Sequence, residues 1–267
     1  MPRAADYHRS CFIWHPVCDG NRMRTAMSLS VLLLATVWLC AQQIPAGTLL
    51  PVMLDNTIDS DKSKPGEAVT AKLMQEVPLP DGAKIKRDSK VFGHVVAVSP
   101  ASSGQGAKIS VQFDKVDIEK QTVPVSVGLR ALASMETVAL AKEPINASSG
   151  YGTTAWDLNM RQIGGQVAFN GAKIVKSQTG QVVGKVPQPG AVLAIPMANP
   201  ARGCGGPTGN TAEQAFWVFS TDACGIYDGK DMTFVSGIAG VNSGQIVLES
   251  PKTVEVRGGS GWLLQVN

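Results

Sequence analysis

Short runs of β-branched and other apolar residues alternate with Gly, Pro and Asp from residue 44 to residue 127. The turn residues recur at intervals of roughly ten, which is typical of an antiparallel sandwich or barrel. The turns, marked by Gly with Pro, Asp or Ser, are expected at residues 64–66, 80–82 and 102–104. The expected strands are residues 48–54, 68–77, 90–98, 108–113 and 122–127.

The clearest single pattern is the strict alternation of polar and apolar residues from Lys108 to Phe113. In a strand, successive side chains point to opposite faces of the sheet. The alternation therefore predicts a strand with one buried face and one face in contact with solvent.

A different pattern begins after residue 128. Pro144 would end a helix that begins at residue 129, and small polar residues fill positions 146–154. We therefore predict one short helix, at residues 129–142, followed by a linker; together they span residues 129–155. The apolar residues that fall near a helical spacing are Leu129, Leu132, Met135, Val138 and Ala139.

The β pattern resumes in the second half of the chain. Together the patterns predict an all-β fold, an antiparallel barrel or sandwich with two β subdomains and one short helix between them. The expected division is a β-barrel-like domain at residues 42–128, the helix and linker, and a second β-rich subdomain at residues 156–267. The later expected strands are residues 166–169, 181–186, 191–195, 215–219, 231–235, 245–248, 253–256 and 262–266.

The first 41 residues have the three-part pattern of a secretory signal peptide. Residues 29–39 are almost wholly apolar, and Arg22 and Arg24 precede them. This run is about half of the roughly 20 residues that a membrane-spanning helix needs, so we expect cleavage after Ala41 and no strong membrane anchor afterwards. A leader counted from Met23 has ordinary length, which predicts that translation starts there.

The numbers of basic and acidic residues in the chain are nearly equal. The whole chain has 24 basic and 21 acidic residues; the first 41 positions hold four Arg and two Asp, so their removal leaves 20 basic and 19 acidic residues. A nucleic-acid binder needs a basic stripe to neutralise phosphates. We therefore expect no nucleic-acid partner. The predicted leader leads us to expect the protein in the periplasm, on the outer envelope or outside the cell.

Two of the five cysteines, Cys204 and Cys224, lie beyond the predicted leader. An even pair in an oxidising compartment predicts a disulfide. Closing a loop of about 20 residues would contribute roughly 3 kcal/mol to stability. Two free thiols are the alternative. A metal site is not expected, because two thiolates without a nearby His supply half of a zinc site.

Residues suited to catalysis are scarce. His94 is the only histidine beyond the predicted leader, and it lies among valines, which favours a structural or surface role. The Ser-x-x-Lys and Gly-x-Ser-x-Gly patterns do not occur beyond residue 41. Residues 258–262 lack the final glycine of the second pattern and predict a tight turn. The sequence therefore predicts no catalytic residue, no metal site and no cofactor, and it favours a protein that is not an enzyme.

Three aromatic residues are candidate binding residues: Trp156, Trp217 and Tyr227. Aromatic rings can bind a ligand by stacking, and they also fill protein cores. If Trp156, Trp217 and a carboxylate share an exposed concave face, a secreted carbohydrate-binding or carbohydrate-active β-sandwich protein is favoured. Burial of both Trp side chains would exclude that alternative.

Several short segments resemble a known family in their order along the chain: IPAGTLLPV at 44–52, IDS at 58–60, GEAV at 66–69, KVFG at 90–93 and VPV at 123–125. Over residues 44–127 this order resembles the TrbI family, the β-barrel scaffold proteins of type IV secretion and conjugal transfer. The resemblance implies an envelope-located barrel that packs against copies of itself. We therefore expect an exported, non-enzymatic envelope protein, a scaffold or a binding module.

Overall fold

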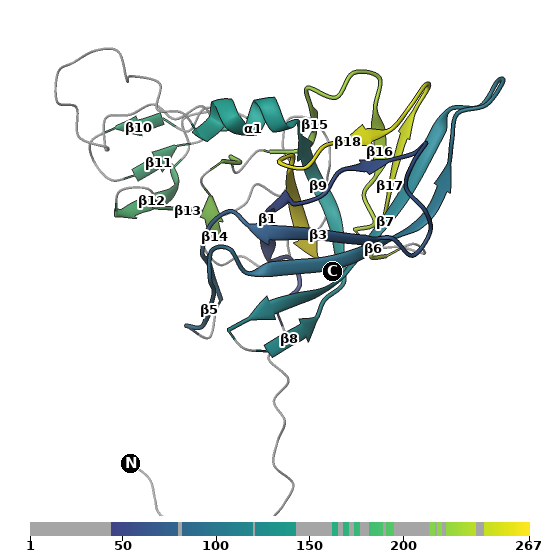
Figure 1. Ribbon diagram of the computed structural model, residues 1–267. Helices are drawn as coiled ribbons and strands as arrows, with labels where there is room; N and C mark the ends of the chain where they lie inside the picture. Colours follow the sequence, from purple (N-terminus) through teal and green to yellow (C-terminus); the bar gives the residue numbers. More distant parts are fainter. Residues whose placement is uncertain are drawn as a thin grey trace, which may run out of the picture. The chain divides into compact units, whose positions relative to one another are not determined.

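The structure of the protein is a computed structural model (Figure 1). Residues 41–267 form one compact unit. The predicted signal peptide and linker, together with Trp156, Trp217 and Cys204, lie outside the residues that the structure describes. The described residues are 44–79, 82–119, 121–142, 162–164, 168–170, 174–176, 182–188, 191–194, 214–216, 218–220, 223–238 and 243–267.

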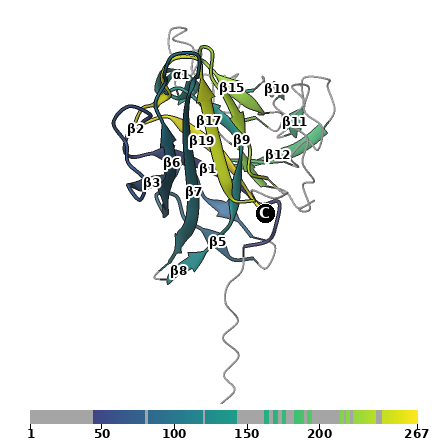
Figure 2. The ribbon, with the colours of Figure 1, turned by 90° about the vertical axis from the view of Figure 1, so that its right-hand side faces the viewer.

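A ten-stranded sheet forms the main part of the described chain (Figures 1 and 2). Nine of the strands follow one path of hydrogen-bonded neighbours, and every pair is antiparallel except the parallel pair of β15 (Gly225–Tyr227) with β9 (Val127–Ala133). The tenth strand, β8 (Gln121–Pro124), lies off this path and pairs with β7. From β9 the path continues through β19 (Gly261–Val266), β1 (Leu49–Leu54), β3 (Ala68–Leu73), β6 (Lys90–Ser99), β7 (Ala107–Ile118), β17 (Gln245–Ser250) and β16 (Thr233–Val235).

Smaller elements complete the described structure. Strand β18 (Glu255–Val256) pairs with β2 (Ile58–Asp59), and β4 (Val77–Pro78) pairs with β5 (Lys84–Ile85). Helix α1 (Met135–Lys142) has eight residues, and the described part of the chain holds no helix long and apolar enough to cross a bilayer. A separate five-stranded sheet contains β10 (Ala168–Asn170), β11 (Ile174–Lys176), β12 (Val182–Gln188), β13 (Ala191–Ala194) and β14 (Gln214–Phe216).

Strand β7 shows the alternation that its sequence predicts except at Ser110, which is buried and accepts a hydrogen bond from the Gln245 side-chain amide at 2.6 Å. Ile109 and Phe113 are fully buried, whereas Lys108 is exposed and Gln112 is half-buried. On the buried face the ring of Phe113 meets Trp262 of β19 edge to face, with centroids 5.7 Å apart and an interplanar angle of 79°. The all-β fold with one short helix, of the sandwich-like class, is confirmed.

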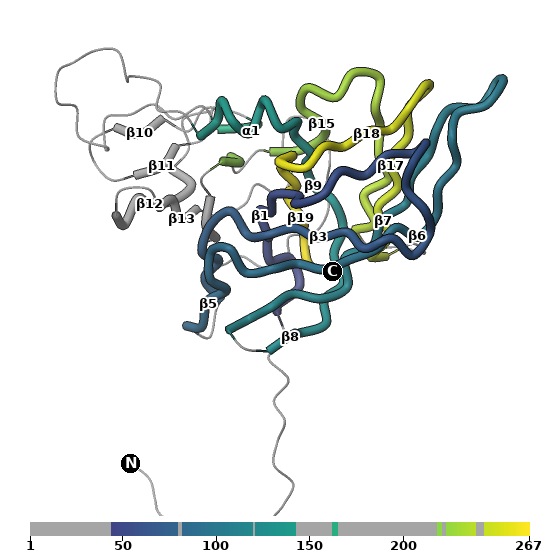
Figure 3. Tube along the Cα trace, viewed as in Figure 1, coloured from purple at the N-terminus to yellow at the C-terminus, as the bar shows by residue number. Residues whose placement is uncertain are grey.

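Strands from the second half of the chain pair with strands from the first half. Strand β19 lies between β9 and β1, and β17 pairs with β7 from Gln245 opposite Gln112 to Ser250 opposite Ala107. Figure 3 shows β19 beside β1, although the two come from opposite ends of the chain. The C-terminal strands cover backbone edges and apolar faces that the first half leaves unpaired, so both halves share one core.

The two ends of the ten-stranded sheet approach each other without forming a strand ladder in the described residues. The Leu129 N–H of β9 donates a hydrogen bond to the Ser236 carbonyl, just after β16, at 2.6 Å. The side-chain amide of Asn267 donates to the Gly237 carbonyl at 3.1 Å. The sheet is therefore rolled and sandwich-like, and its described ladder does not close into a barrel.

The predicted helix over residues 129–142 is wrong in its first half. Val127–Ala133 is strand β9, and the helix begins only at Met135. All seven residues of β9 are buried, so the strand has no polar face and its sequence lacks the alternation of a half-buried strand. A short apolar run of this kind cannot be distinguished from a buried helix by periodicity.

Replacing Gly93 by Ala is expected to destabilise the sheet. An ideal Cβ at this position would lie 2.2 Å from the Gln112 carbonyl oxygen and 2.9 Å from the Phe113 Cα, at a register shift between β6 and β7. Because both atoms belong to the backbone, neither can move aside without breaking the ladder. We expect a loss of about 2 kcal/mol in urea unfolding, whereas Ser99→Ala on the same strand should change stability by less than about 0.5 kcal/mol. Equal effects of the two substitutions would contradict this account.

Candidate functional site

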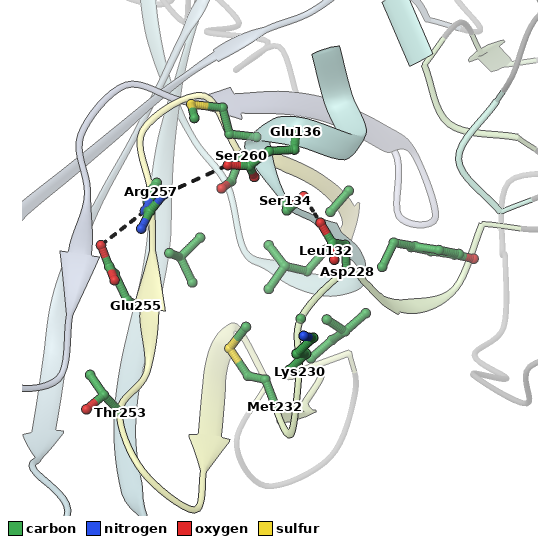
Figure 4. A pocket seen from close by; sticks show the side chains of 16 residues that line it. Leu132, Ser134, Glu136, Asp228, Lys230, Met232, Thr253, Glu255, Arg257 and Ser260 are labelled. Atoms are coloured by element: carbon green, nitrogen blue, oxygen red, sulfur yellow. Dashed lines mark hydrogen bonds and ion pairs between the residues drawn. The ribbon is translucent and has the colours of Figure 1, made fainter. Parts of the chain in front are cut away.

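A pocket of about 450 Å³ lies between the start of α1, β15 with the loop that follows it, and the turn from β18 to β19 (Figure 4). Its apolar lining includes Leu132, Ile226, Met232 and Val256. Its polar lining includes the charged residues Glu136, Asp228, Lys230, Glu255 and Arg257. The volume falls within the range of about 300 to 1,000 Å³ that is usual for small-molecule sites. We call this the α1–β15 pocket.

Ser134 connects two walls of the α1–β15 pocket. Its Oγ accepts a hydrogen bond from the Thr137 N–H at 3.1 Å, and its carbonyl accepts one from the Val138 N–H at 3.0 Å. Ser134 is therefore the N-cap residue of α1. Its hydroxyl also donates to Asp228 Oδ2 at 2.9 Å, and Figure 4 shows this contact across the pocket. The cap thus ties the helix to the loop after β15.

The loop at residues 228–231 contains two residues in the left-handed region of backbone conformation. Asp228 and Asp231 both have φ of 58°. Asp adopts this conformation more readily than most residues, yet it is uncommon outside glycine. Such conformations persist where surrounding contacts hold them, and they cluster at functional sites. The bond from Ser134 to Asp228 is one such contact.

Arg257 links the third wall, the turn from β18 to β19, to the start of α1. Its Nε lies 3.3 Å from Glu255 Oε1 and its Nη1 lies 3.8 Å from Glu136 Oε1 (Figure 4). The side chains of all three residues are about half exposed. Ion pairs as exposed as these contribute about 0 to 1 kcal/mol, so they hold the charges in place more than they stabilise the fold.

Asp59 lies on β2, the strand that pairs with β18, and β18 carries Glu255 in the pocket lining. Asp59 faces Glu255 in the β2–β18 pair, and its side chain is only 8% exposed. A 2.7 Å hydrogen bond from Lys62 Nζ is the main cause that lowers the pKa of the Asp59 carboxyl below its ordinary 3.8. Burial acts in the opposite direction, and the Asp61 N–H, which donates to Oδ1 at 2.8 Å, lowers the pKa further.

Tyr227 is the one binding candidate from the sequence whose position is described. It lines the α1–β15 pocket, and its hydroxyl accepts a hydrogen bond from the Cys224 N–H at 3.0 Å. Trp156 and Trp217 lie outside the described residues, so their grouping with a carboxylate stays a prediction. The pairing of Cys204 with the buried Cys224 also stays a prediction, because Cys204 lies outside them.

His94 lies on the sheet surface and not in the lining of the α1–β15 pocket. Its Nδ1 is 3.2 Å from Asp114 Oδ2, and its side chain is 40% exposed. Within the described ranges, no three His, Cys, Asp or Glu side chains come close enough together to hold a metal ion. The sequence predicts a tight turn at residues 258–262; the structure has one at residues 257–260, where the Ser260 N–H donates to the Arg257 carbonyl at 3.0 Å, and β19 begins at Gly261.

The charged residues of the pocket could not be selected from the sequence. Ser134 and Thr137 are spaced as the N-cap residue and the third residue of a helix. This spacing is the one local signal of the pocket in the sequence. Asp228-Gly229 is an ordinary turn sequence, and Arg257 is one cation among many. They form a site only because three distant segments of the chain meet there.

No known family model matches the sequence, and no curated protein matches it. The resemblance of residues 44–127 to the TrbI family therefore stays a prediction.

Ser134→Ala is expected to lower stability by about 1 kcal/mol, because it removes both the helix cap and the bond to Asp228. Ser134→Thr keeps a hydroxyl in the same place and should lose less than half as much. Urea unfolding, followed by circular dichroism, measures both values. A Thr variant as unstable as the Ala variant would show that the hydroxyl is not the important group.

Asp59→Asn is expected to destabilise the protein by about 1 kcal/mol at pH 7, where the wild-type carboxylate is charged. A lowered folded-state pKa means that this stabilisation is complete above pH 3.8 and is lost as the pH falls through the folded-state value. The difference between variant and wild type should therefore shrink below pH 3.8. Urea unfolding at pH 7, 5, 4 and 3 tests this, with the exposed Asp88→Asn as control. A difference that does not change with pH would contradict the role given to the charge.

Proposed function

We propose that the protein is exported to the cell envelope and acts there without catalysis, as a scaffold or binding module that uses the α1–β15 pocket as its contact site. The apolar segment at residues 29–39 and the two preceding Arg residues support export. The resemblance of the segment order at residues 44–127 to the TrbI family supports a scaffold role in the envelope. The composition of the pocket is the observation that carries the proposal.

The polar groups of the pocket suit binding better than proton transfer. Each described carboxylate has a partner in the protein itself: Asp228 accepts from Ser134, and Glu136 and Glu255 face Arg257. The described lining contains neither His nor Cys. A general base or nucleophile needs a free position beside the reacting atom, whereas paired charges act as fixed donors and acceptors for a ligand.

The lining also indicates the kind of ligand. Six apolar side chains and charges of both signs are combined in one depression of moderate volume. Protein contact surfaces have an apolar centre and a polar rim of this type. A segment of another protein, with an apolar side chain flanked by charged ones, matches this chemistry. The partner is then a second copy of the chain or another envelope protein.

The decisive experiment is mild cross-linking of the protein in its native envelope, followed by size-exclusion chromatography and mass spectrometry of the co-eluting proteins. Wild type should elute in an assembly. Arg257→Glu should reduce the captured partner at least tenfold, because it places three carboxylates together on the rim. Lys64→Glu, on an exposed residue outside the pocket lining, makes the same change in charge and should leave capture unchanged.

A wild-type protein that elutes as a monomer without partners would contradict the proposal. A glycan array then tests the alternative function. Retention on a glycan, lost on replacing Trp156 or Trp217 by Ala, would indicate a carbohydrate-binding protein.

A further inference from the structure

Three cations from different elements lie near the end of α1, as the contacts around them show. Lys142 contacts Met53, which lies opposite Lys72 in the pair of β1 and β3. The N–H of Asp88, the residue after Arg87, donates a hydrogen bond at 2.9 Å to the carbonyl of Leu73, the residue after Lys72. Lys142 is the last residue of the helix, Lys72 lies on β3, and Arg87 lies in the turn between β5 and β6. Lys142 Nζ lies 3.3 Å from the sulfur of Met53 on β1. Seven residues separate the two ends of α1, which corresponds to about 10 Å, so this cluster is separate from the α1–β15 pocket.

Nearby acids offset these charges only weakly. Lys72 Nζ is 3.9 Å from Asp55 Oδ1, and Arg87 Nε is 3.9 Å from Asp88 Oδ2. Both distances are long for charged hydrogen bonds, which are usually about 2.7 to 2.9 Å. The contact of Lys142 is to a thioether, which carries no charge.

Neighbouring residues increase the positive charge. Lys90 lies directly opposite Lys72 in the antiparallel pair of β3 and β6, an arrangement that is unfavourable for like charges. Glu76 is engaged by Lys84 at 3.0 Å and is therefore occupied elsewhere. The cluster thus has more positive than negative charge in the part of the chain that the structure describes.

The electrostatic consequence is visible at Lys142. Partial burial is the main cause that lowers the pKa of its amine below 10.5, and the charges of Arg87 and Lys72 lower it further. Nearby like charges disfavour the charged form of an amine. A bound anion would relieve this repulsion.

We propose that Lys72, Arg87 and Lys142 form a binding site for a phosphoryl group, carried by an anionic phospholipid headgroup or by a soluble phosphate compound. A phosphoryl group presents three oxygens, so three cations from three directions can each contact a different oxygen. The Arg guanidinium offers two parallel donors, and each Lys ammonium acts as a compact charge. The carbonyl end of α1 repels anions, so the group binds at the Lys142 Nζ beside Met53 and not on the helix axis.

The test uses the purified protein in a phosphate-free buffer of low ionic strength. Isothermal titration with pyrophosphate should show binding to wild type. Lys142→Met, which keeps the apolar part of the side chain, and Arg87→Gln should each weaken the affinity at least tenfold. Lys252→Gln removes one exposed cation elsewhere and should change the affinity less than twofold.

Vesicles separate the two sources of the phosphoryl group. Co-sedimentation with phosphatidylglycerol vesicles but not with phosphatidylcholine vesicles, lost in the same two variants, assigns the site to headgroups. Pyrophosphate binding without vesicle binding assigns it to soluble compounds. Neither form of binding, or an equal loss in Lys252→Gln, would overturn the proposal.

Thermal unfolding shows whether the variants fold. Without anions, Lys142→Met should unfold at the wild-type temperature or above it, because a repelled charge has been removed. If it unfolds lower, Arg87→Gln alone decides the outcome, because its side chain is 72% exposed and its removal leaves the core intact.

Discussion

The position of the C-terminal strand β19 is the constraint on which most of the structure depends. All six of its residues are buried, and it pairs on one side with β1 and on the other with β9. Trp262, in this strand, contributes its ring to the contact with Phe113 in the core. Because about 200 residues separate β19 from β1, the pairing joins the two ends of the described chain. The core of the N-terminal strands is complete only with β19 between β1 and β9.

The α1–β15 pocket follows from this arrangement. Strand β9 is fixed by β19, and it continues through Ser134 into α1. Strand β15 pairs with the other edge of β9, and the turn that leads into β19 carries Arg257. Three walls from distant parts of the sequence therefore meet at one place. The hydrogen bond of Ser134 to Asp228 and the pairs of Arg257 then set the distances between them.

The sequence predicted individual strands better than their neighbours. Residues of β1, β6 and β7 lie within or across the expected ranges, because alternation and turn residues are local signals. The sequence pattern indicates a helix at residues 129–133, which belong to strand β9, because burial on both faces removes the alternation. The place of β17 and β19 in the sheet depends on contacts across the whole chain, which no local pattern records. The same holds for the pocket, and for Lys72, Arg87 and Lys142, whose positions in the sequence are far apart.

Helix α1 connects both proposed binding sites to the same strand. Val138 and Ala141 face the sheet, and a Cβ added at Gly261 would lie 2.7 Å from Val138 Cγ2 and 3.2 Å from the Phe219 ring. The first residue of β19 must therefore be small for the helix to lie at its observed distance. A displaced helix would move Ser134 at one end and Lys142 at the other. The two sites are chemically independent, since one is a mixed pocket and the other a cluster of cations. Both sites nevertheless depend on the position of α1, so a change at Gly261 should affect both. A change in either set of charges should affect only one site.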